Sequence, residues 1–107
     1  MDLQQLIERA REIRSKYADF ETKRNGREWT GEELVLGFVG DVGDLAKLVQ
    51  AKEGIRTAEN VDDALAHELS DCMWSIIVLA DKYGVDLEKA FVKTMDELET
   101  RLNSSPL

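Results

Sequence analysis

Residues 40–48, GDVGDLAKL, and residues 67–77, HELSDCMWSII, are the two stretches of this 107-residue chain that decide its fold. Both are apolar helical stretches that contain two acidic residues three positions apart: Asp41, Asp44, Glu68 and Asp71. This spacing puts both carboxylates of a pair on one helix face, about 5–6 Å apart at Cβ. A carboxylate in an apolar stripe lowers stability unless a positive group binds it. Two such faces turned toward each other would form an oxygen-rich site suited to Mg²⁺.

Helical periodicity extends outward from these stretches over the whole chain, and no segment alternates as a strand does. We therefore predict an all-α fold, a four-helix bundle-like single domain covering residues 1–107. A frayed tail is expected at residues 103–107. The expected helices cover about residues 2–24, Thr30 to Glu53, Asn60 to Tyr83, and Asp86 to the tail.

Start signals support these boundaries. Thr30 is followed three residues later by Glu33, which is the pattern of a capping box. Asn60 and Asp63 form a similar start signal for the third helix. Asp86 is the expected N-cap of the fourth.

The composition limits the partners of the chain. Asp and Glu outnumber Lys and Arg by 22 to 14, which gives a net charge of −8. Sequence-independent binding to a nucleic-acid polymer or to an anionic membrane is therefore not expected. An anionic substrate would need a metal ion as intermediary. The apolar stripes also exceed what one small bundle needs to bury, so we expect a homodimer or homotetramer.

The location is expected to be cytoplasmic. Cys72 is the single cysteine and cannot form an intrachain disulfide, which fits a reducing compartment, and we expect it to be a small buried apolar residue. The start, MDLQQLIERARE, is charged throughout, unlike a secretory signal. The longest nearly apolar stretch, residues 72–80, is far shorter than the ~20 residues that span a bilayer.

The other chemistry-bearing residues narrow the possible reactions. His67 neighbours Glu68 and so points about 100° away from it around the helix, as expected of a surface residue. The chain has no second histidine, no cysteine pair and no GxSxG motif, which removes zinc-type and serine-nucleophile mechanisms. Metal-assisted attack by water remains.

Two long segments carry a family resemblance: WTGEELVLGFVGDVGDLAKLVQAKEG, residues 29–54, and ELSDCMWSIIVLADKYGVDLEKAF, residues 68–91. They resemble the all-α nucleoside triphosphate pyrophosphohydrolases of the MazG-like superfamily, and most of all its small dCTP-pyrophosphatase-like branch. The likeness covers about residues 29–102, and GxVGxLA, ELSD and LAxxxGVDL are its most specific parts.

The resemblance implies Mg²⁺-dependent hydrolysis of a nucleoside triphosphate to the monophosphate and pyrophosphate, as in the removal of unwanted nucleotides, with Mn²⁺ as a possible substitute. Asp41 is the candidate catalytic residue, combining metal binding with orientation of water. Trp29, just before the second helix, is placed either to stack on a base or to pack as a core or interface aromatic. Arg101 matches the arginine of the family's last helix and would contact the substrate, and Lys93 could take the place of the family's lysine beside it. The implied metal ligands are Asp41, Asp44, Glu68 and Asp71.

The chain also departs from the family pattern. Its first acidic pair consists of aspartates where relatives have glutamates, and Thr94 and Leu98 stand where many relatives have lysine and asparagine. Two alternatives to an enzyme therefore stay open. One is a catalytically weakened metal- or nucleotide-binding helical module that acts by association, and the other is a helical oligomer without a ligand.

Overall fold

The computed structural model describes residues 1–104 and contains four α-helices and no strand within that range. The predicted all-α fold is therefore confirmed, and the helix boundaries lie within two residues of those expected. The last three residues of the tail, 105–107, lie outside the described part of the chain. The helices are α1 (Leu3–Asn25), α2 (Gly31–Lys52), α3 (Val61–Lys82) and α4 (Leu87–Asn103).

Two of the three predicted start signals act as expected. The Thr30 side chain accepts from the Glu33 N–H and the Glu33 side chain accepts from the Thr30 N–H, which completes the capping box. Asp86 accepts from a backbone N–H of α4. Asn60 does stand directly before α3, as predicted, but its side chain makes no capping hydrogen bond and its backbone is left-handed, with φ 51°. An N-cap side chain reaches the first turn from an extended backbone, which Asn60 does not have.

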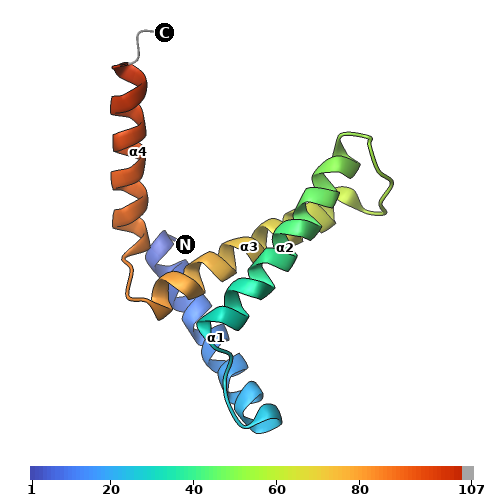
Figure 1. Ribbon diagram of the computed structural model, residues 1–107, viewed down its shortest axis with the longest axis vertical. Coiled ribbons are helices and arrows are strands. Elements are labelled where there is room, and N and C mark those ends of the chain that lie inside the picture. The colour runs from blue at the N-terminus through green and yellow to red at the C-terminus, as the bar shows by residue number, and fades with distance from the viewer. Residues whose placement is uncertain (105–107) are drawn as a thin grey trace.

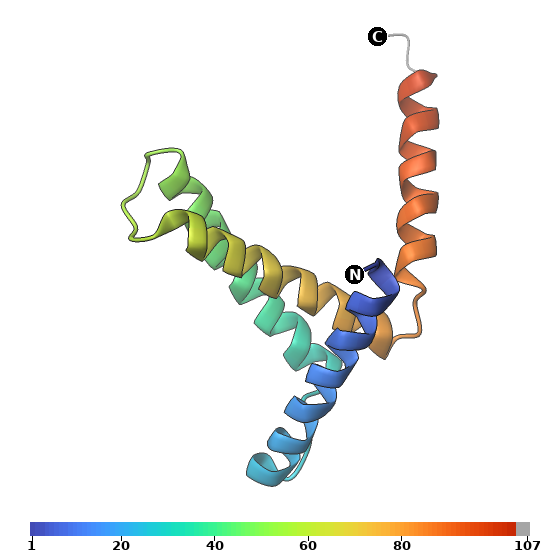
Figure 2. The same cartoon turned by 180° about the vertical axis from the view of Figure 1, so that it is seen from behind.

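Three helices pack together and define the position of the site. Figures 1 and 2 show α2 and α3 side by side as an antiparallel hairpin, with α1 crossing α3 near the end of that helix. Ile7 and Ala10 of α1 pack with Ile77 of α3 in the buried core, against which Trp74 also lies. Cys72 is buried, as predicted.

Helix α4 projects away from the other three (Figure 1) and contains no buried residue. Phe91 and Leu102 of this helix are 59% and 74% exposed. The radius of gyration is 17.2 Å, against about 13 Å for a compact domain of 100 residues. The bundle-like prediction therefore holds for α1, α2 and α3 but not for α4, which packs against the core only at its first residue, Leu87.

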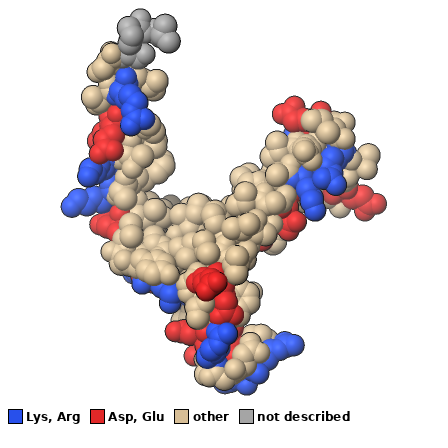
Figure 3. All heavy atoms as spheres, viewed as in Figure 1, with Lys and Arg blue, Asp and Glu red and all other residues tan. Residues whose placement is uncertain are grey.

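Charged side chains are distributed unevenly over the surface. Figure 3 shows mostly uncharged side chains over the middle of the molecule and charged side chains gathered toward its three arms. Within residues 1–104, no helix combines the length and the apolar character that crossing a membrane requires.

Candidate metal and nucleotide site

The α2–α3 hairpin brings three of the four predicted carboxylates together. Asp41 and Asp44 lie on α2 and Glu68 lies on the facing side of α3. One carboxylate oxygen from each lies within 4.8 Å of the other two. This is the size of group that a single cation could bind with oxygen ligands.

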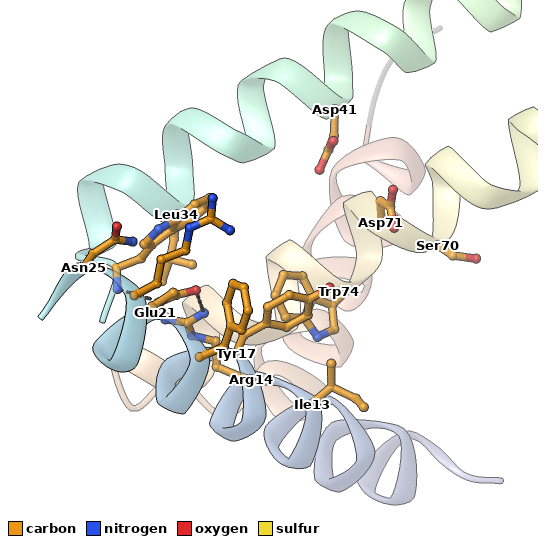
Figure 4. Close-up of a pocket in the computed structure, with 13 residues that line it drawn as sticks. Ile13, Arg14, Tyr17, Glu21, Asn25, Leu34, Asp41, Ser70, Asp71 and Trp74 are labelled. Atoms are coloured by element: carbon orange, nitrogen blue, oxygen red, sulfur yellow. Dashed lines mark hydrogen bonds and ion pairs between the residues drawn. The ribbon is translucent and has the colours of Figure 1, made fainter. Parts of the chain in front are cut away.

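The fourth carboxylate, Asp71, lies outside this group of three. Its Oδ2 is 3.1 Å from Nε2 of His67, one turn earlier on α3. His67 is 73% exposed, as expected of a surface residue, but its contact with Asp71 was not foreseen. Figure 4 shows Asp71 on α3 and Asp41 on α2, facing each other across one end of a cleft. Asp71 is therefore next to the cluster and is held by its own partner.

The electrostatics of the cluster favour a bound cation. Burial raises the pKa of Asp41, and the charges of Asp71 and Asp44 raise it further. Burial likewise raises the pKa of Glu68, and the charges of Asp41, Asp71 and Asp44 raise it further. The Oε2 atom of Glu68 is buried and has no hydrogen-bond partner among the described residues. An unpaired buried oxygen among like charges is what a hard divalent cation would satisfy, so these residues fit Mg²⁺ or Mn²⁺.

A cleft of about 740 Å³ begins at the acidic cluster and runs between α1, α3 and the start of α2 (Figure 4). Asp41 and Asp71 line one end of it. The rest is lined by aromatic and aliphatic side chains together with charged and polar ones of α1, among them Arg14, Glu21 and Arg24. The rings of Tyr17 and Trp74 lie with centroids 5.9 Å apart and planes tilted by 59°. A concave space of this size that combines aromatic surfaces with a few polar groups is typical of a small-molecule site.

The sequence analysis missed an ion pair in the wall of this cleft. Arg14 donates two hydrogen bonds to Glu21, Nη1 to Oε2 at 2.9 Å and Nη2 to Oε1 at 2.8 Å. The Arg14 hydrogen bond is the main reason that the pKa of Glu21 is lowered, and burial opposes it. Arg14 and Glu21 are seven positions apart, which is almost two complete helical turns, so they lie on the same face of α1. Opposite charges at this spacing were the signal from which the pair could have been predicted.

The structure places Trp29 in the wall of the same cleft. It lies in the connection before α2, is 41% exposed, and its ring approaches Gly37. A Cβ atom on residue 37 would lie 3.8 Å from Cζ3 of this indole. The indole is therefore open to the cleft on part of its surface and supported by α2 on another part.

Lys93 and Arg101 are exposed on α4, which leads away from the cluster (Figure 1). Nζ of Lys93 lies 3.9 Å from Glu97, one turn further along the same helix. Neither residue lines the cleft. A single chain therefore does not bring these two residues together with the carboxylates.

Comparison with known proteins identifies the family. Residues 29–104 match the MazG nucleotide pyrophosphohydrolase domain. The chain belongs to this family. The match includes the four acidic residues, Trp29, Lys93 and Arg101, and it excludes the ion pair of α1.

Several relatives share about a third of their aligned residues with this chain. The chain is 35% identical over 72 residues to the Gene 37 protein of Mycobacterium phage L5. This alignment covers 64% of the present chain and 62% of the phage protein. It is 33% identical over 91 residues to dCTP pyrophosphatase 1 of Rattus norvegicus and 34% identical over 93 residues to that of Homo sapiens. Both alignments cover 79% of this chain and 54% of the mammalian protein. The chain thus spans about half the length of the mammalian relatives.

Proposed function

We propose that this MazG-family chain hydrolyses a nucleoside triphosphate to the monophosphate and pyrophosphate, using Mg²⁺ or Mn²⁺. The observation that carries the proposal is the convergence of three carboxylates, one with an unpaired buried oxygen, at the end of an aromatic cleft. The family match and the relatives named dCTP pyrophosphatase 1 support this class of reaction.

Asp41, Asp44 and Glu68 would hold the cation, and Asp71 would complete the set when its side chain turns from His67 toward them. A bound divalent cation neutralises phosphate charge and lowers the pKa of a water molecule. Asp41 belongs to both the acidic cluster and the cleft lining. It is the candidate to accept a hydrogen bond from the attacking water and to orient it toward the phosphate.

The aromatic part of the cleft would bind the base and sugar. Trp29 and Tyr17 offer ring faces to a planar base, while the carboxylate end would receive the triphosphate with its cation. Since the net charge of the chain is −8, the triphosphate would depend on the metal for attraction to this end. A pyrimidine triphosphate such as dCTP belongs in the test set because of the named relatives.

A second copy of the chain would supply the remaining contacts. The apolar side of α4 is exposed, and so are Val35, Leu36 and Val39 on α2. We propose a homodimer or homotetramer in which these surfaces are buried and α4 of one chain reaches the site of another. Lys93 and Arg101 would then contact phosphate oxygens there.

The alternative function is a metal- or nucleotide-binding module without turnover. It is favoured by the remoteness of α4 from the acidic cluster and by Thr94 and Leu98, which offer neither a cation nor an amide. In that case the cleft would bind a nucleotide, but no pyrophosphate would appear.

One experiment separates these possibilities. Canonical and modified nucleoside triphosphates are incubated with the chain and Mg²⁺ or Mn²⁺, and the release of pyrophosphate is measured. Glu68→Gln should lower the rate of release on the order of 10²–10³-fold, whereas Asp63→Asn, which changes an exposed acid on the same helix, should not change it. Nucleotide binding without release would favour the binding module. Release at an unchanged rate in Glu68→Gln would contradict the proposed site.

A further inference from the structure

Glu21 joins α1 to the residue that precedes the capping residue of α2. It is 6% exposed, an unfavourable place for a carboxylate without partners. Beside its two hydrogen bonds from Arg14, its Oε1 accepts the backbone N–H of Trp29 at 2.7 Å. The same carboxylate therefore holds the main chain of a cleft residue that lies eight positions further along.

Trp29 is held from its other side as well. The next residue, Thr30, is tied to Glu33 by the capping box, with N–H to Oε1 at 3.1 Å and Glu33 N–H to Oγ1 at 3.2 Å. Gly26 closes α1 in a left-handed conformation with φ 81°, so only residues 26–30 connect the two helices. With both ends of the connection fixed, the hydrogen bond from the Trp29 N–H to Glu21 holds the main chain that carries the indole against α1.

We propose that Glu21, itself held by Arg14, is a positioning residue for nucleotide binding that acts by fixing Trp29 in the wall of the cleft. This inference rests on the proposed function, which assigns the base to that wall. In this role Glu21 acts through the backbone N–H of Trp29. Both members of the ion pair precede residues 29–104, so this device is not part of the matched family domain.

The test compares two double variants of equal charge. R14M/E21M removes the ion pair and leaves no acceptor for the Trp29 N–H, whereas R14Q/E21Q keeps an amide oxygen at position 21. Replacing a buried ion pair by apolar side chains of similar size is often neutral or stabilising, so R14M/E21M should fold. R14Q/E21M differs from R14Q/E21Q only in the acceptor and repeats the comparison in a second background.

We expect R14M/E21M to raise KM for the nucleoside triphosphate about tenfold, with kcat changed less than about threefold. R14Q/E21Q should recover most of this increase. Both double variants lack Arg14, so the loss of any direct contact between Arg14 and the nucleotide is the same in both and does not affect the comparison. Glu12→Gln removes a carboxylate from the exposed side of the same helix and should leave both constants unchanged. A purely structural role would lower the stability without separating KM from kcat.

A second readout does not depend on activity. In a Trp74→Phe background, Trp29 is the only tryptophan, and acrylamide quenching reports its accessibility. Quenching should increase in R14M/E21M and stay near the parent value in R14Q/E21Q. Equal quenching in R14M/E21M and R14Q/E21Q overturns the inference. An equal KM in these two variants also overturns it, provided that the parent is active. Failure of the parent to release pyrophosphate from any triphosphate rejects the proposed function instead, and quenching then decides the positioning role alone.

Discussion

Carboxylates lie near both ends of the cleft, partly buried at one end and buried at the other, but only one end gives them a partner of opposite charge. At the α2–α3 end, Asp41 and Glu68 lie among like charges, and the pKa of each is raised. At the α1 end, Arg14 neutralises Glu21, whose pKa is lowered. Buried charge with its partner already present belongs to the framework of the site. Buried charge of one sign, with an oxygen left unpaired, marks the place where a ligand is expected.

The largest expected effect on stability comes from removing only one member of the Arg14–Glu21 ion pair. Arg14→Met leaves Glu21 buried without its partner, and the loss of unfolding free energy should be about 3–5 kcal/mol. R14M/E21M should recover most of it, because no unpaired charge remains. Denaturation by urea measures both, and a double variant as unstable as the single one would contradict this view of the pair.

Removing charge from the unpaired end should have the reverse effect on stability. Glu68→Gln should lower kcat/KM on the order of 10²–10³-fold, because a metal ligand is lost. The metal-free protein should become more stable at neutral pH, since the variant carries one fewer repelling charge at a partly buried position. Pyrophosphate release and thermal melting without metal test the two parts separately. A variant that keeps its activity and melts earlier would reverse the assignment of the two ends.

Metal binding should stabilise the unpaired end alone. At a Mg²⁺ concentration one hundred times the dissociation constant, linkage adds about 2.7 kcal/mol to the unfolding free energy. The melting temperature of the parent and of R14Q/E21Q should therefore rise with Mg²⁺ or Mn²⁺, while that of Glu68→Gln should not. A parent whose melting temperature is unchanged by millimolar metal would count against the cluster as a metal site.

The smallest expected effect is on the pH dependence of stability. Because the pKa of Glu21 is lower in the folded chain than its ordinary value of 4.5, the unfolded chain binds more protons in this range. Its stabilisation is present above pH 4.5 and is lost as the pH falls through the lowered pKa. The unfolding free energy of the parent should decrease more steeply with acidification than that of R14Q/E21Q. Parallel curves would show that the ion pair contributes no pH dependence.

The local parts of the structure could be predicted from the sequence, because they depend on neighbouring residues. The helices follow from apolar spacing, and the capping box at Thr30 and Glu33 depends on residues three apart. The start of α3 at Asn60 was also predicted, but the capping by its side chain was not realised, because its left-handed backbone is a property of the connection between α2 and α3.

In the candidate site, too, local features could be predicted from the sequence and contacts between helices could not. Helical spacing alone places Asp41 and Asp44 on one face, and family resemblance pointed to the same four carboxylates. The spacing could not show that Glu68 joins them while Asp71 turns to His67, because this depends on how α2 and α3 are rotated against each other. The contribution of α1 to the cleft was missed for a similar reason, since Glu21 meets Trp29 only after the chain has turned.

The sequence by itself determined the helices, the caps at Thr30 and Asp86, the acidic faces and the family, since each is encoded within a few turns of helix or in a continuous motif. Only the tertiary structure decided which carboxylates converge, where the cleft lies, and that α4 stands apart from the acidic cluster. The physical reason is that packing between helices depends on the fit of whole surfaces. Residues distant in sequence meet through that fit, and no local spacing specifies it.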